Sequence, residues 1–151
     1  MARWPRRGRR GDGRLTKQIV VDESRNRLYW HTGLDIYMLN LTNNNSYALS
    51  RNEFIVAAIA VHKESGDIFA SREDQLEIYR MNLNDSKVIF KGPAIQGGAI
   101  GINQDAGQLY WSYKPNFQDT TIASAQISSL QEVSEMVTLS HSNSVHFLAV
   151  P

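Results

Sequence analysis

The chain has 151 residues, of which 42% are hydrophobic and 21% are charged, and its formal net charge is +1. This composition is ordinary for a globular protein and excludes a fibrous or wholly disordered chain. Cysteine is absent, which excludes disulfide scaffolds and cysteine-based zinc sites. The sequence contains no run of about 18 apolar residues, so it predicts no membrane span.

Positive charge is concentrated at the start of the chain. Residues 1–14 contain six arginines and one aspartate, a charge of +5 that leaves −4 for the rest. A segment of Arg, Gly and Pro buries no apolar surface, so we predict a disordered Arg-rich arm over 1–14. We favour a solvated tail over an arm that binds nucleic acid. Leu15 leads straight into the first strand, so the apolar stretch of a secretory signal peptide is not visible.

From residue 15 onward, a pattern of four short strands recurs about every forty residues. In each copy, two core positions are separated by seven residues: Val21 and Leu28, Val61 and Ile68, Ile102 and Leu109. Alternating apolar and polar residues between turn signals predict strands, and a period of this length is typical of propeller blades.

We therefore predict an all-β fold, a partial β-propeller over 15–151. It consists of about three four-stranded blades, at about 15–50, 53–91 and 95–140, plus the first strand of a fourth at 145–151.

The third copy departs from the pattern between its second and third strands. Thirteen residues separate the core positions of these strands, against eight in the first copy. The excess predicts a loop over 113–119 that contains Tyr113 and Phe117, and loops carry function more often than the scaffold beneath them. The alternative is that both aromatics cap the blade edge. Gly97-Gly98 is interpreted as a turn that precedes the first strand of this copy.

An aromatic pair marks the second strand of each copy. The pairs are Tyr29-Trp30, Phe69-Ala70 and Tyr110-Trp111. The stretch Asp22 to Trp30, followed by Ile36-Tyr37 and Asn40-Leu41, resembles the YWTD repeat of low-density-lipoprotein-receptor-type β-propellers, and the resemblance covers roughly residues 15 to 150. The resemblance implies a six-bladed, extracellular module that binds proteins or small ligands without catalysis.

The Thr and Asp positions of this motif are occupied by other residues, and none of the three copies keeps the acidic residue that joins neighbouring blades in the family. The positions hold His31-Thr32, Ser71-Arg72 and Ser112-Tyr113. Other six-bladed relatives therefore remain alternative assignments, including secreted carriers of small aromatic ligands, such as insect ommochrome-binding proteins.

Two sets of side chains follow as candidates. Tyr and Trp combine large apolar area with one hydrogen-bond donor, so we predict blade-to-blade contacts by Tyr29, Trp30, Phe69, Tyr110 and Trp111. The candidate ligand-binding residues are His31, Arg72, Tyr113 and Phe117.

We predict no catalytic, cofactor-binding or metal-binding residue. The four histidines lack metal-ligand spacing, and neither a phosphate loop nor a nucleophile elbow is present. Propeller hydrolases resembling gluconolactonase hold a metal at the central mouth, and Asp22, His62 and Asn103 end corresponding first strands, so a metal-dependent hydrolase is a further alternative. We favour the interpretation that these side chains cap strand-to-strand turns.

Localisation and partners complete the prediction. Asn40, Asn44 and Asn84 each begin an Asn-X-Ser/Thr acceptor for N-glycosylation, which favours a secreted or extracellular protein. Three blades do not close a ring of six. If an open end exposes about 300 Å² of apolar surface, it forfeits roughly 7 kcal/mol at about 25 cal/mol per Å². We expect the remaining blades to come from a longer chain, which we favour, or from a second copy.

Overall fold

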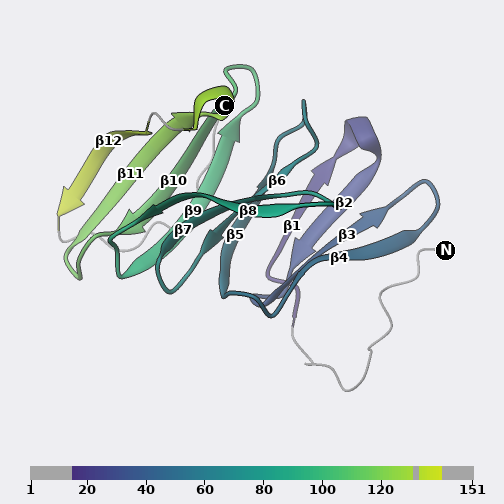
Figure 1. Cartoon of the computed structure of the whole chain (residues 1–151), viewed down its shortest axis with the longest axis horizontal. Helices are drawn as coiled ribbons and strands as arrows, with labels where there is room; N and C mark the ends of the chain where they lie inside the picture. Colours follow the sequence, from purple (N-terminus) through teal and green to yellow (C-terminus); the bar gives the residue numbers. More distant parts are fainter. Residues whose placement is uncertain (1–14, 131–132, 141–151) are drawn as a thin grey trace.

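The computed structural model describes residues 15–130 and 133–140, and in this part of the chain the fold is all-β. Three antiparallel four-stranded sheets follow one another along the sequence and stand side by side in space (Figure 1), which confirms the predicted fold class. The predicted arm at 1–14 and the predicted fourth blade at 145–151 lie outside the described residues. No helix among the described residues is long and apolar enough to cross a membrane.

The first sheet is a meander of β1 (Gln18–Asp22), β2 (Arg27–His31), β3 (Asp35–Asn40) and β4 (Asn45–Arg51). A short 3-10 turn joins β1 to β2, and the chain leaves it through Asn26 in the left-handed region, with φ of 53°. Asparagine tolerates this conformation better than most residues, so the turn follows from the local sequence.

The second sheet repeats this order with β5 (Val56–Val61), β6 (Ile68–Arg72), β7 (Leu76–Met81) and β8 (Ser86–Gly92). Its first strand is almost wholly apolar, as expected for a strand covered on both faces. Its last strand is mostly exposed or half-buried. Polarity therefore rises from β5 outward to β8.

The third sheet contains β9 (Gln96–Asn103), β10 (Gln108–Lys114), β11 (Asp119–Gln126) and β12 (Val133–Ser140). In all three sheets, the core positions seven residues apart face each other directly across the first strand pair: Val21 and Leu28, Val61 and Ile68, Ile102 and Leu109. The seven-residue spacing in the sequence therefore corresponds to the register of the first strand pair in each sheet.

Two details of the third copy differ from the prediction. Tyr113 is not in a loop, because β10 continues through a bulge between Trp111 and Tyr113 and pairs with β11 as far as Thr121. The connection between β10 and β11 shortens to residues 115–118. Gly97 and Gly98 likewise lie inside β9 and not in a turn.

Apolar side chains fill both spaces between the sheets. Tyr29 packs in the cluster between the first and second sheets, and Phe69 and Trp111 pack in the cluster between the second and third. Trp30 is buried and stacks on Tyr37 with ring centroids 5.3 Å apart, and Tyr110 is half-buried.

Backbone hydrogen bonds join successive sheets at the same place. The Val56 amide donates to the Gly33 carbonyl at 2.8 Å, and the Gly97 amide donates to the Glu73 carbonyl at 2.9 Å. In each case, the loop between the second and third strands of one sheet contacts the start of the next sheet. Gln96, at the start of β9, pairs with Lys114, which directly precedes the third loop, so all three loops lie on one side of the molecule.

Candidate functional site

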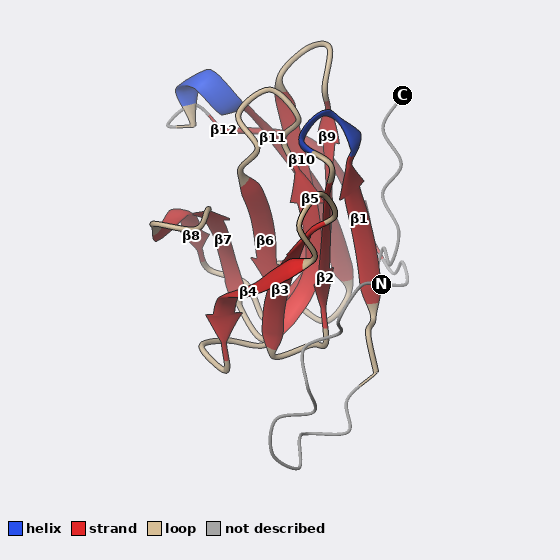
Figure 2. Ribbon diagram, turned by 90° about the vertical axis from the view of Figure 1, so that its right-hand side faces the viewer, coloured by secondary structure: helices blue, strands red, loops and turns tan. Residues whose placement is uncertain are grey.

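Each sheet has two ends, and the candidate ligand-binding residues all lie at or beside the same one. We call this the loop end and define it by the connections between second and third strands: residues 32–34, 73–75 and 115–118. The loops at both ends of the strands are visible in Figure 2. His31, Arg72 and Tyr113 stand at or near the ends of β2, β6 and β10, and Phe117 lies in the last of the three loops.

His31 is buried, with 1% of its surface exposed. Its Nδ1 atom accepts a hydrogen bond from the Gly33 amide at 3.1 Å, which requires that nitrogen to be unprotonated. Burial, with a further contribution from the positive charge of Lys17, lowers the pKa of His31 to about 4. The imidazole is therefore a neutral element of the loop end near pH 7.

Arg72 is held in a charged network. Its guanidinium contacts the Asp74 carboxylate at 2.5 and 3.0 Å and the Glu77 carboxylate at 3.2 Å. The Asp74 hydrogen bond, above all, raises the pKa of Arg72. Burial by itself raises the pKa of Glu77, but hydrogen bonds from Tyr79 and Arg72 bring it below its usual value. The network orders the loop of the second sheet and occupies the guanidinium.

The two aromatic candidates differ in exposure. Tyr113 is 9% exposed and belongs to the core cluster between the second and third sheets, whereas Phe117 is 87% exposed. The loop around Phe117 is ordered by Asn116. The Asn116 side chain accepts hydrogen bonds from the amides of Gln118 and Asp119, both at 2.8 Å, and donates to the Asp119 carboxylate at 2.8 Å. Among the four candidates, the aromatic ring of Phe117 stands most fully in solvent.

Sequence reasoning missed one repeated element at this end. Asp35, Glu77 and Asp119 stand at or next to the start of each third strand, at a constant interval of 42 residues. Asp35 accepts from the Asn52 amide at 2.9 Å and from the Tyr37 hydroxyl at 3.1 Å. With the bonds of Glu77 and Asp119 described above, each carboxylate stabilises the loop end of its own sheet. The constant interval was a signal that could have revealed them.

At the opposite end, Asp22 and Asn103 cap turns as predicted, whereas His62 bonds a side chain and not the backbone. The Asp22 carboxylate accepts from the Arg25 amide at 3.3 Å and from the Ser24 hydroxyl at 2.6 Å. The Asn103 side chain accepts from the Ala106 amide at 3.2 Å. The His62 ring bonds Ser65 at 2.8 Å, and burial above all lowers its pKa. Within the described ranges, no three His, Cys, Asp or Glu side chains are grouped to hold a metal ion.

The glycosylation candidates also lie at this opposite end, in the connections between third and fourth strands. Asn40 ends β3, Asn44 follows in the same turn, and Asn84 occupies the corresponding turn of the second sheet. Asn84 is exposed, and Asn40 and Asn44 are half-buried.

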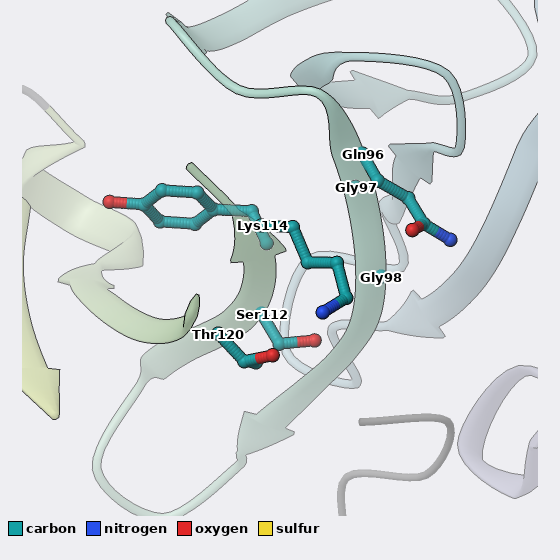
Figure 3. Close-up of a pocket in the computed structure, with 7 residues that line it drawn as sticks. Gln96, Gly97, Gly98, Ser112, Lys114 and Thr120 are labelled. Carbon is teal, nitrogen blue, oxygen red and sulfur yellow. The ribbon is translucent and has the colours of Figure 1, made fainter. Parts of the chain in front are cut away.

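A small crevice lies in the third sheet, beside the start of β9 (Figure 3). It has a volume of about 10 Å³, enough for about one water molecule. Figure 3 shows the side chains of Ser112, Thr120 and Lys114 gathered beside the strand that carries Gly97 and Gly98. The Thr120 hydroxyl is buried and has no hydrogen-bond partner among the described residues. The crevice is suited to one polar group and not to an organic ligand.

No protein-family model matches the sequence, and a search of curated proteins finds no match. Among solved structures, the fold is similar to a chain in the crystal structure of a nidogen/laminin complex, with a TM-score of 0.68 and 17% sequence identity. The match covers 83% of this chain and 49% of that chain, so the present chain spans about half the length of its neighbour. At this identity the likeness shows the fold alone, and it supports a propeller.

Proposed function

We propose that this chain is part of a non-catalytic, extracellular propeller module of the YWTD-like type, and that it binds a protein partner through its loop end. The observation that carries the proposal is the presentation of Phe117. The Phe117 ring is large, apolar and 87% exposed, so it does not belong to the core formed by the described residues. Aromatic residues are typical anchors of protein interfaces.

The Phe117 loop is preorganised for such a role. Asn116 holds the backbone on both sides of Phe117 through three hydrogen bonds. A loop that is already ordered loses less conformational entropy when it binds. An exposed ring on an ordered loop therefore favours recognition of a partner over a packing function.

The bonding of the acid and base side chains supports a non-catalytic module. The hydrolase alternative would use Asp22 and His62 as metal ligands, but Asp22 caps a turn and His62 bonds the Ser65 hydroxyl. Glu77 is bonded to Arg72 and Tyr79. An assay of lactone and ester hydrolysis with added divalent metals would contradict this part of the proposal if it detected turnover.

Two further observations support extracellular protein binding. The glycosylation candidates lie at the end opposite the loops, so glycans there would leave the loop end accessible. The structural neighbour comes from a nidogen/laminin complex, which shows that a chain with this fold occurs in a complex of two proteins. We extend that behaviour to the present chain as a proposal.

Replacing Phe117 with alanine tests the proposed interface. A panel of extracellular proteins, laminin included, is titrated against the immobilised chain by surface plasmon resonance. We expect Phe117→Ala to weaken the observed binding about 30-fold or more, the effect of losing an interface anchor. Leu83→Ala is the matched control, because Leu83 is 47% exposed in a turn at the opposite end. Equal loss in both variants, or no partner in the panel, would contradict the proposal.

We also propose that the open side of the first sheet receives another propeller blade. Ile19 and Val21 in β1 are 53% and 42% exposed. The corresponding pairs, Ile59 with Val61 in β5 and Ile100 with Ile102 in β9, are all below 9% exposed and lie between the sheets, in clusters that include the preceding sheet. The molecule therefore shows two filled versions of the interface that Ile19 and Val21 leave open.

That blade comes either from a longer chain or from a second copy, and self-association distinguishes the two. If a second copy supplies it, sedimentation equilibrium will show a two-chain assembly that the double variant Ile19→Ser, Val21→Ser abolishes. Val88→Ser, at a 44% exposed position in the outer strand β8, serves as control and should leave the assembly intact. A wild-type chain that stays monomeric would contradict a second copy and assign the blade to a longer chain.

A further inference from the structure

The loop end also carries a hollow that does not involve the Phe117 loop. It is an open hollow of about 490 Å³ between the start of the first sheet, the β2–β3 loop and the residue before β5. Its lining residues are Leu15, Lys17, Thr32, Gly33, Leu34 and Ile55. This volume lies in the range of small-molecule sites, about 300 to 1,000 Å³.

Among the described residues that line the hollow, Lys17 is the only charged one. Its backbone amide donates to the His31 carbonyl at 2.8 Å, which fixes the residue beside β2. Its side chain lies over Gly33, because a Cβ built on Gly33 would meet the Lys17 Nζ at 3.1 Å and Cε at 3.3 Å. Lys17 forms no ion pair with any described residue. Its positive charge is therefore available to a ligand.

Thr32 adds a second donor next to this cation. Its hydroxyl oxygen accepts a hydrogen bond from the Asp35 amide at 3.3 Å. The hydroxyl proton remains available for donation, since one O–H both accepts and donates. An ammonium group and a hydroxyl in the same hollow suit a carboxylate, which accepts several hydrogen bonds and binds most strongly to charged donors.

The other side chains of the hollow are apolar and accessible. Leu15 is 83% exposed, Ile55 is 40% exposed and Leu34 is half-buried. An apolar ligand body would cover these side chains, and the removal of apolar surface from water would favour binding. The Lys17 charge and the apolar side chains of the hollow would therefore contact different parts of one ligand.

We propose that this hollow binds a small monocarboxylate with an apolar body. The carboxylate pairs with the Lys17 ammonium and the Thr32 hydroxyl, and the apolar body lies against Leu15, Leu34 and Ile55. This site is separate from the protein-binding role of Phe117, and either proposal can fail without the other.

The test uses 11-(dansylamino)undecanoic acid and its methyl ester, titrated into the whole chain and followed by dansyl fluorescence. We expect the acid to bind saturably and about tenfold more tightly than the ester, because only the acid pairs with Lys17. Lys17→Met keeps the apolar stem of the side chain and removes its charge. It should therefore weaken the acid about tenfold and leave the ester unchanged.

Two control variants and one variant that adds a charge to the hollow make the result specific. Lys87→Met removes an exposed lysine from β8 and should leave the affinity for the acid unchanged. Phe117→Ala should also leave it unchanged, which separates this site from the protein interface. Leu34→Asp places a negative charge in the hollow and should weaken the acid more than the ester. Equal affinity of acid and ester, or an unchanged affinity in Lys17→Met, would overturn the proposal.

Discussion

Gly97→Ala is expected to lower the free energy of unfolding by about 3 kcal/mol or more, because backbone and not side chain fills the space beside Gly97. A Cβ at this position would overlap the carbonyl oxygen of Arg72 and lie 3.1 Å from that of Gln75. Gly97 also donates the hydrogen bond that joins β9 to the Glu73 carbonyl. The added methyl group would therefore separate the second and third sheets where their backbones meet.

Urea unfolding, monitored by tryptophan fluorescence, measures this effect. Gly92→Ala is the matched control, because a Cβ at Gly92 would meet the end of the flexible Leu76 side chain at 3.2 Å. We expect Gly92→Ala to change the free energy of unfolding by less than about 1 kcal/mol. Similar stability of the two variants would show that the sheets do not approach each other as closely at Gly97 as the structure indicates.

Acidification from pH 7 to pH 4 is expected to remove up to about 3 kcal/mol of stability through His31 alone. The pKa of His31 falls from 6.5 to about 4 in the folded chain, and each pKa unit corresponds to about 1.4 kcal/mol. Above pH 6.5 the imidazole is neutral in both states, and the stability is complete. Between pH 6.5 and 4 the unfolded chain binds a proton that the folded chain does not, so the stability decreases as the pH falls.

The variant His31→Gln isolates this contribution. Glutamine keeps an acceptor for the Gly33 amide but does not titrate. Urea unfolding at pH 7.5 and pH 5 should show that the wild type loses about 2 kcal/mol more than the variant over this interval. Burial also lowers the pKa of His62. Because His62 is present in both proteins, it changes the pH dependence of their stability in the same direction. An equal pH dependence in the two proteins would show that His31 is accessible to protons.

Much of the fold was predictable because the spacing of residues within each repeat specifies the strands and their pairing. The seven-residue separation of core positions corresponds to directly opposed residues in all three first strand pairs. The turn-capping roles of Asp22 and Asn103 were also predictable, because such bonds form between residues three apart. These features depend on neighbours in the sequence, and local spacing therefore specifies them.

The candidate site was less predictable, because its properties depend on contacts between sheets. Tyr113 was expected in a loop, but a bulge extends β10 and packs its ring in the core. Gly97 was expected in a turn, but it allows close contact between two sheets. Both positions are determined by residues far away along the chain.

The sequence by itself determined three four-stranded units of one kind, their strand register and the capping of their turns, since all of these follow from spacing within a repeat. Only the tertiary structure decided which of the four candidate side chains stands in solvent and where Lys17 faces an apolar hollow. Burial and electrostatic environment arise when sheets pack against one another, and that packing joins residues about forty positions apart.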